Sequence, residues 1–439
     1  MENDKNIPPG PKGQPFIGNI VEFTEDPLKF LLKCSREYGD VVRMSKNAYL
    51  VNHPDLIRQV LHNKDGTYEK TDPGDRHKNH SAFPASVMNS SGTDWQDKKR
   101  ALQPVFHKTP VNDGIGRSAA VLHSFIHAWR QEPPGPDMRQ EMQRLCMKTG
   151  STFLLGAQIE EGEALQVVQT VDAIMALTRS QIRFPSFVPT PNNLRLRRAR
   201  LDLDRAMDRI IARYRDASPR QPCLLGTLLE HDASGRSGWL RDELATMIMS
   251  GLEPMADALT WVFYLLALHA GIQQKLADEI RAAAGDTFSV PALDVSRLAC
   301  ANAVMKEALR LYPPAWMTGR IAIREDRLGG FRIPKGTTLT ISPWATHRDP
   351  RFFLDPDEFL PDRWLDGGLE ESSRYAYLPF GSGSRKCIGD HFSMHQMIMV
   401  VAAIVHSFRL ELEPGTQVRP YPALVLRPLG VQIRVTPRP

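Results

Sequence analysis

A short loop around Cys387 constrains this chain more than any other feature of its sequence. Residues 380–390 read Phe-Gly-Ser-Gly-Ser-Arg-Lys-Cys-Ile-Gly-Asp, and an apolar segment with helical spacing follows. The glycines before the cysteine allow backbone angles that other residues avoid, and Gly389 allows a flat group to approach closely. A cysteine just before a helix start, with Arg385 nearby, is in a position that lowers the pKa of a thiol. The loop therefore predicts a site that holds a thiolate. The alternative is a helix-capping loop with an inert, buried cysteine.

Composition excludes several other classes of protein. The five cysteines lie at positions 34, 146, 223, 300 and 387 without a CxxC pair, which excludes common zinc patterns and a disulfide framework. Scattered cysteines are typical of a reducing compartment. The net charge of +5 is too small for a dedicated nucleic-acid-binding protein. The polar start and the lack of a long apolar run predict no signal segment, no membrane anchor and a cytoplasmic location.

The spacing of apolar residues predicts a mainly α-helical chain with small β-sheets, an α+β fold. No linker or repeat divides the chain, so we expect one domain over residues 1–439, with a Pro-rich lead-in over residues 1–19. Helices are expected over residues 95–106, 201–214, 240–269, 272–284, 301–311 and 390–408. Strands are expected over residues 40–44, 48–51, 319–323, 331–333 and 337–342, and an extended tail over residues 423–435.

The cysteine loop resembles the haem-binding signature of the cytochrome P450 superfamily, Phe-x-x-Gly-x-Arg-x-Cys-x-Gly. The five fixed positions of this signature are matched by Phe380, Gly383, Arg385, Cys387 and Gly389. The resemblance implies that the Cys387 sulfur is the axial ligand of the iron of haem b, and that Phe380 packs against the haem face. It also implies the P450 fold, with the haem between the long central helix and the helix after the cysteine. Similarity to the family runs from about residue 8 to residue 435.

Two further motifs extend the resemblance. Glu307-Ala308-Leu309-Arg310 resembles the Glu-x-x-Arg of the family, and Arg363 resembles the third member of the same structural charge network. Taken alone, such a pair is more often an ordinary surface ion pair. Gln396, in the helix after the cysteine, departs from the family because a glutamate is frequent at that position.

Several cations resemble the residues that bind the haem propionates in the family. Trp95 and Lys99 resemble its Trp-x-x-x-Arg, although lysine keeps the charge without the two-pronged donor geometry of arginine. Arg320 and Arg385 are further candidates, and Lys70 is a weaker one.

The central helix departs from the family at a position that matters for chemistry. It reads Ser250-Gly251-Leu252-Glu253-Pro254-Met255 where the family usually has Ala/Gly-Gly-x-Asp/Glu-Thr-Thr. Gly251, Glu253 and Pro254 are therefore the candidate catalytic positions. The threonine hydroxyl of the family, with water, helps to deliver protons during oxygen activation, and Pro254 has neither a hydroxyl nor an N–H. We expect Pro254 to preserve a local kink, to delete the alcohol and to leave the Ser250 carbonyl free.

Three outcomes of this substitution stay open. In the first, the enzyme retains ordinary hydroxylation, with water or a substrate group in place of the hydroxyl. In the second, it performs an unusual oxidation, such as ring contraction, rearrangement, desaturation or coupling. In the third, it is impaired or uses peroxide directly. Because function resides in the site and not in the fold, the sequence does not choose among them.

The resemblance implies a haem-thiolate monooxygenase that uses O2 and electrons from a separate redox partner. Its substrate is expected to be a small apolar molecule, such as a terpenoid or another natural product, which undergoes hydroxylation or multi-step oxidation in an apolar pocket. Residues in segments that the resemblance assigns to this pocket are Phe83, Phe184, Phe187, Met255, Trp316, Leu424 and Val425. A haem protein that binds or senses without turnover is the alternative from another class.

The chain has no flavin motif and no cysteine spacing for an iron–sulfur cluster, so its electrons must come from another protein. Lys98, Lys99, Arg100 and Lys386 are expected near the cysteine side of the haem. A basic patch there would attract an acidic ferredoxin. The protein is expected to be a monomer.

Overall fold

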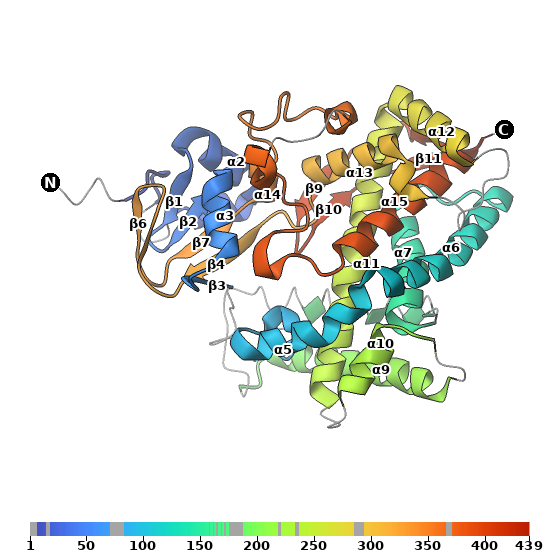
Figure 1. Cartoon of the computed structure of the whole chain (residues 1–439), viewed down its shortest axis with the longest axis horizontal. Coiled ribbons are helices and arrows are strands. Elements are labelled where there is room, and N and C mark those ends of the chain that lie inside the picture. Colours follow the sequence, from blue (N-terminus) through green and yellow to red (C-terminus); the bar gives the residue numbers. More distant parts are fainter. Residues whose placement is uncertain are drawn as a thin grey trace.

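In a computed structural model of the protein, the described residues are 7–438, apart from 15–17, 71–82, 158, 161, 164–165, 168, 171–172, 175–187, 218–220, 233–236, 285–293 and 366–370. Helices dominate this part of the chain, and they gather on one side of a smaller, sheet-containing region (Figure 1). The α-helices are α1 (Ile20–Glu25), α2 (Pro27–Tyr38), α3 (Pro54–His62), α5 (Gly92–Leu102), α6 (Lys108–Gln131), α7 (Met138–Leu155), α9 (Pro191–Asp216), α10 (Leu224–His231), α11 (Ser237–Leu268), α12 (Ala270–Ala284), α13 (Ala299–Leu311), α14 (Pro343–Thr346) and α15 (Asp390–Ser407).

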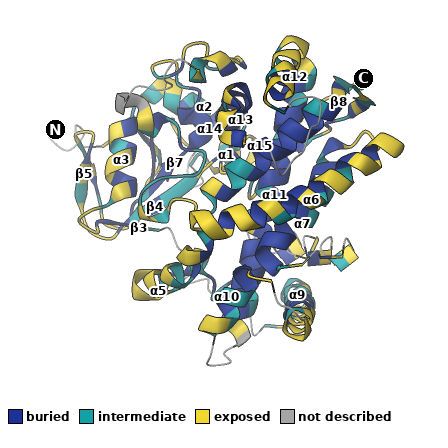
Figure 2. Ribbon diagram, turned by 45° about the vertical axis from the view of Figure 1, so that its right-hand side comes forward, coloured by how far each residue is buried: buried dark blue, intermediate teal, exposed yellow. Residues whose placement is uncertain are grey.

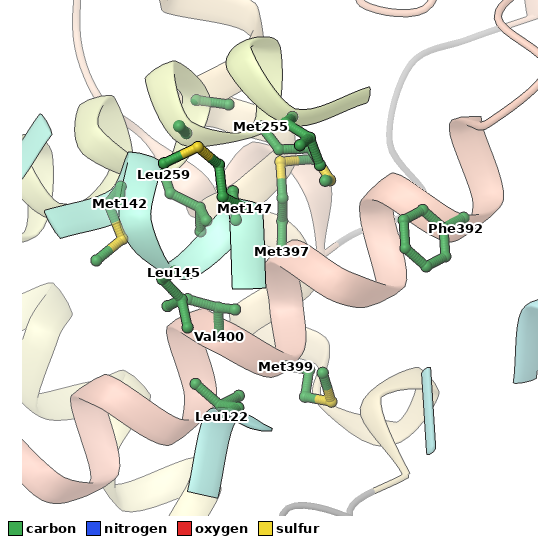
Figure 3. Close-up of a cluster of buried hydrophobic side chains, with 14 of the residues drawn as sticks. Leu122, Met142, Leu145, Met147, Met255, Leu259, Phe392, Met397, Met399 and Val400 are labelled. Atoms are coloured by element: carbon green, nitrogen blue, oxygen red, sulfur yellow. The ribbon is translucent and has the colours of Figure 1, made fainter. Parts of the chain in front are cut away.

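Helix α11 runs through the centre of the helical region. Its sequence is apolar on nearly all sides, as expected of a helix surrounded by other helices, and it is buried along most of its length (Figure 2). Figure 3 shows the packing of this core, where Met255 of α11 lies beside Met397 of α15 and Met147 of α7. Unbranched, flexible methionines fill the irregular gaps between helices that cross at different angles.

A five-stranded sheet forms most of the smaller region. Its strand order is β1-β2-β7-β4-β3, and only the β2–β7 pair is parallel. At one edge of this sheet, Lys70 of β3 is directly paired with Arg320 of β4. The strands of this sheet are β1 (Val41–Ser45), β2 (Ala48–Val51), β3 (Tyr68–Lys70), β4 (Thr318–Ala322) and β7 (Thr338–Ile341).

Three two-stranded antiparallel sheets complete the described β-structure. They pair β5 (Asp326–Leu328) with β6 (Phe331–Ile333), β8 (Phe408–Leu412) with β11 (Ile433–Pro437), and β9 (Arg419–Pro422) with β10 (Leu426–Leu429).

The predicted fold class is confirmed, whereas several boundaries differ. The helix expected over residues 95–106 ends at Leu102, and a 3-10 turn over Gln103–Phe106 follows, because Pro104 cannot donate the helical hydrogen bond. The tail expected as one extended segment is divided between β10 and β11, which pair with different strands. Helices α6 and α7 were not among the predicted ranges. The single-domain organisation stays a prediction.

Candidate active site

A cavity of about 470 Å³ lies between α11, the cysteine loop and the edge of the five-stranded sheet. One part of its wall is apolar and is formed by Met247, Met255 and Ala258 of α11, together with Met397 and Val425. Another part is basic. The cations that line it are Lys70, Lys99, Arg320, Arg385 and Lys386.

Cys387 also lines this cavity, and the loop geometry explains why glycines flank it. Cys387 is exposed, whereas the other four cysteines are buried. Gly381 and Gly383 have positive φ values of 67° and 72°. A Cβ atom at Gly383 would lie 2.1 Å from the carbonyl oxygen of Leu61, so α3 could not pack against a loop with a larger residue there. The loop is closed by the Cys387 N–H, which donates to the carbonyl of Phe380 over 2.9 Å.

The electrostatics of Cys387 differ from the expectation drawn from the sequence. Although Cys387 is exposed to the cavity, the protein atoms around its sulfur desolvate it and raise the pKa of the thiol, and this effect exceeds the opposing hydrogen bond from the N–H of Gly389. The Arg385 guanidinium lies over the Trp95 ring, 4.0 Å from the ring centroid, and it is not among the groups that lower the pKa of this thiol. The loop therefore does not by itself lower the pKa of this thiol, as a site for a free thiolate would. A metal ion bound to the sulfur would do so, since metal coordination deprotonates a thiol.

The basic wall fits an anionic group. Arg320 is 7 % exposed, and burial lowers the pKa of its guanidinium. It donates a hydrogen bond to the carbonyl of Gly319, and it has no carboxylate partner in the described part of the chain. Lys99 donates to the carbonyl of Ser384 over 2.8 Å and lies over the Trp95 ring. Paired cations at Lys70 and Arg320 repel each other, so a bound anion such as a haem propionate would stabilise both.

A buried charge network lies near the cysteine loop. Arg310 and Glu307 are fully buried, and two hydrogen bonds of 2.8 and 2.9 Å join them. Arg363 donates to the same carboxylate over 3.0 Å. The remaining donors of Arg310 are taken by backbone carbonyls of His347, Pro356 and Glu358. The structure thus brings the three predicted members together.

Two members of this network were not predicted from the sequence. The indole N–H of Trp364 donates to Glu307 over 2.7 Å. His347 is fully buried, its Nδ1 lies 3.0 Å from the Arg310 carbonyl, and its Nε2 accepts from the N–H of Leu378, which lines the cavity. Burial lowers the pKa of His347 to about 3, so its ring is neutral. No periodic pattern or motif marks His347 in the sequence, because its partners are backbone groups distant in the chain.

The three candidate catalytic positions on α11 differ in their surroundings. Pro254 and Ser250 line the cavity, and Pro254 lies inside an uninterrupted helix. Glu253 does not line the cavity. Its buried carboxylate forms an ion pair with Arg139, with 3.2 Å between the nitrogen and the oxygen, and a second ion pair with Arg427. Gly251 packs against Leu154 of α7. Of the three, the geometry places only Pro254 where it can touch a bound molecule.

The predicted substrate-pocket residues are similarly divided. Met255 and Val425 line the cavity. Phe83 and Trp316 are buried in the core, and Leu424 is 38 % exposed at the surface, so none of these three lines the described cavity. Phe184 and Phe187 lie outside the described residues. Met88 and Met247, which bound two of the segments assigned to the pocket by resemblance, also line the cavity. Met397 lines it too but was missed, because a single methionine carries no distinctive sequence signal.

The predicted basic patch is also rearranged. Lys98 turns inward and donates to Ala85 and Ser90, Lys99 faces the cavity, and Arg100 pairs with Asp97. Of the predicted patch, Lys386 lies at another basic surface, which borders the cysteine loop at a hollow of about 860 Å³. Its cationic or titratable residues are His62, Lys306, Arg374 and Lys386.

Among the described residues, no single helix is long and apolar enough to cross a membrane. By length and composition alone, α11 and α12 pass this test only together, as a pair bent by 110°.

Comparison with known proteins assigns the chain to a family. The sequence model of the family described as Cytochrome P450 matches residues 8–435. The chain is 33 % identical to cyclooctat-9-en-7-ol 5-monooxygenase of Streptomyces melanosporofaciens, over 92 % of this chain and 90 % of that protein. It is 31 % identical to cyclooctatin synthase of the same organism, over 98 % of this chain and 95 % of that protein. It is 30 % identical to pentalenene oxygenase of Streptomyces avermitilis, over 98 % of this chain and 97 % of that protein. The chain therefore belongs to the cytochrome P450 family: it is a haem b-dependent monooxygenase that acts on small organic molecules with O2 and electrons from separate proteins.

Proposed function

We propose that this enzyme hydroxylates an apolar, cyclic terpenoid in the cavity beside α11, with Cys387 as the axial ligand of the haem iron. One observation carries the proposal: the exposed cysteine opens into a cavity that is apolar along α11 and basic at the sheet edge. In this arrangement Lys70, Lys99, Arg320 and Arg385 bind or order the two propionates, and Phe380 and Gly389 shape the loop under the haem. When bound, the haem supplies oxygen activation, and the protein supplies orientation and exclusion of water.

The substrate class rests on the relatives and on the cavity wall. The names of the three relatives describe oxygenation of cyclooctat-9-en-7-ol and pentalenene and the synthesis of cyclooctatin. The methionines at 247, 255 and 397 give this cavity a soft apolar surface, which suits a rigid hydrocarbon with few polar groups.

The axial ligand is tested by replacing the sulfur. Cys387→Ser should abolish the strongly red-shifted band of the reduced, carbon monoxide-bound protein, because only thiolate ligation produces it. Cys300→Ser changes a buried cysteine elsewhere and should keep the band. A red-shifted band in Cys387→Ser would refute the assignment.

The substrate class is tested by a panel of cyclic terpene hydrocarbons and alcohols. A substrate should displace the water ligand of the iron and shift the absorption spectrum, and its oxidation should require both O2 and reductant. Spectral binding without such a product would favour the alternative, a haem protein that binds its ligand without turnover.

The role of Pro254 is tested at the same cavity wall. We expect Pro254→Thr to change the product profile or the share of reducing equivalents that reaches product, because it restores an alcohol beside Ser250. If both quantities stay unchanged, Pro254 does not shape the chemistry, and ordinary hydroxylation without the alcohol is the better description.

The electron donor is proposed to be an acidic ferredoxin that docks at the basic hollow beside the cysteine loop. Lys306, Arg374 and Lys386 supply the positive charge there. The reduction rate should fall with rising salt concentration, and a flat dependence would contradict this docking. A monomeric state and a cytoplasmic location are part of the same proposal.

A further inference from the structure

One wall of the cavity is formed by a short segment, residues 83–90, called here the cover segment. Val87 and Met88 of this segment line the cavity. The segment folds on itself through hydrogen bonds of Ser86 and Asn89, and its 3-10 turn spans Val87–Asn89. Such a turn has few internal bonds, so its position over the cavity depends on contacts with the rest of the protein.

Two adjacent carboxylates of α11 supply these contacts. Asp242 accepts from the N–H of Ala85, and Glu243 accepts from the N–H of Val87, each over 2.7 Å. The two side chains are 2 % and 0 % exposed. Met247 of the cavity wall lies one helical turn after Glu243. The acids therefore join the helix that forms one wall directly to the segment that forms another.

Cations from two other elements bond the same segment, and a third cation pairs with one of the acids. Lys98 of α5 donates to the carbonyl of Ala85 and the hydroxyl of Ser90 over 2.7 and 2.8 Å. Arg385 of the cysteine loop donates to the carbonyl of Ser90 over 2.8 Å. Arg200 of α9 pairs with Asp242. The cover segment is thus fixed by charged side chains of α5, α11 and the cysteine loop, and Arg200 of α9 holds the Asp242 carboxylate in place.

Glu243 is costly in this position, which argues against a purely structural role. Its Oε1 has no hydrogen-bond partner among the described residues. The charges that face it are Lys98 and Asp94 of α5 and the neighbouring Asp242, and burial raises the pKa of Glu243 to about 7. A neutral side chain would fill the same space without this desolvation penalty.

We propose that Asp242 and Glu243 are positioning residues that set the shape and the closure of the substrate cavity, by holding Val87 and Met88 at its wall. The enzyme then favours substrates whose apolar surface packs against Val87 and Met88. A bound substrate leaves only after the hydrogen bonds at the N–H groups of Ala85 and Val87 have broken. This inference rests on the proposed function, because it assumes that an apolar molecule binds in the cavity.

The test compares two probes that bind haem iron through an imidazole nitrogen. 4-Phenylimidazole carries an apolar ring that we expect to reach the cover segment, whereas we expect imidazole to be too short to reach it. In Glu243→Leu, the dissociation rate of 4-phenylimidazole should rise about tenfold, the ratio expected when a buried hydrogen bond is lost. The dissociation rate of imidazole should change less than about twofold, because imidazole is held by its bond to the iron and does not contact the cover segment.

A matched control separates position from general stability. Glu279 of α12 also accepts two backbone N–H groups, from Cys300 and Ala301 over 2.7 and 3.0 Å, but it does not line the described cavity. Glu279→Leu should lower thermal stability and leave both dissociation rates unchanged. An equal rise for both probes in Glu243→Leu, or a similar rise in Glu279→Leu, would overturn the proposal.

A conservative variant keeps the test decisive if Glu243→Leu does not fold. Glu243→Gln still accepts from Val87 and cannot ionise. Because the pKa of Glu243 is higher when the segment is closed over it than when water reaches it, rising pH favours opening. Between about pH 5 and 7.5 the dissociation rate of 4-phenylimidazole should therefore increase in the wild type and stay flat in Glu243→Gln. A dissociation rate does not depend on protonation of the free probe. Equal pH profiles would refute the role of Glu243, whereas failure of the wild type to bind either probe would refute the proposed haem site instead.

Discussion

Two groups of buried charges in this protein solve the same physical problem in opposite ways. Around Glu307, each carboxylate oxygen receives at least two hydrogen bonds, from Arg310, Arg363, Trp364 and the backbone of Leu360. Along α11, Glu243 and Asp257 each keep one oxygen without a hydrogen-bond partner among the described residues. A fully paired carboxylate has its hydrogen-bonding capacity satisfied and fixes structure, whereas the partly paired carboxylates of α11 have a raised pKa. The group around Glu307 therefore holds its surroundings rigidly, whereas the acids of α11 lie in a region whose structure we expect to respond to ligand binding and to pH.

The largest effect should come from breaking the paired group. Arg310→Ala leaves the Glu307 carboxylate buried without its main partner and also frees three backbone carbonyls. We expect a loss of about 3–5 kcal/mol in the free energy of unfolding, measured by urea denaturation of the purified protein. Arg281→Ala removes an exposed pair with Asp278 and should cost less than about 1 kcal/mol. If the two variants lost similar amounts of unfolding free energy, the charge network around Glu307 would not stabilise the fold more than a surface ion pair does.

Replacing the proline of α11 should have the next largest effect, of opposite sign. Pro254 lies inside an uninterrupted helix, where it cannot donate to the carbonyl of Ser250. Pro254→Ala restores this donor and should raise the free energy of unfolding by up to about 3 kcal/mol. Thermal and urea denaturation of the haem-bound protein measure the gain. An unchanged or lower stability would mean that Pro254 packs well enough to offset its missing N–H.

The sequence predicted the two groups unequally, and the reason is physical. Glu307, Arg310 and Arg363 stand at fixed spacings in a motif, because their geometry requires those residue types. The acids of α11 appeared only as part of a helical pattern. Their partners are the backbone of residues 85 and 87 and an arginine of α7, which no local pattern connects to them. The fold class could be predicted from periodicity. The resemblance placed Pro254 and Met255 at the cavity, where the structure has them. The packing of Gly251 on helix α7 could not be predicted, because that helix was not among the predicted ranges.

The pH dependence of stability should reveal the partly paired group. Asp257 is fully buried, Arg139 donates to its Oδ1 over 2.7 Å, and burial raises the pKa of this carboxyl from 3.8 to about 7. A raised folded-state pKa means that the folded protein holds a proton which the unfolded chain has lost. The contribution to stability is therefore complete below about pH 4 and disappears as the pH rises to about 7.

We expect a decrease on the order of 2 kcal/mol across this range in the wild type, and a smaller decrease in Asp257→Asn. Urea denaturation at a series of pH values measures both slopes. Because Asp257→Asn keeps the size of the side chain and the acceptor for Arg139, a change in slope reports on the proton and not on packing. Parallel slopes would show that Asp257 is ionised in the folded protein across the range.

The smallest predicted effect sharpens the comparison at a third buried polar group, Gln396 of α15. It is fully buried, and neither its Nε2 nor its Oε1 has a hydrogen-bond partner among the described residues. Gln396→Met keeps the length of the side chain and removes both unpaired atoms, so it should raise the free energy of unfolding by about 1 kcal/mol. Gln396→Glu restores the residue frequent in the family, but it places a charge in the same surroundings and should lower stability at neutral pH. The opposite result, a stabilising glutamate and a destabilising methionine, would show that this site holds a polar partner and belongs with the paired group around Glu307.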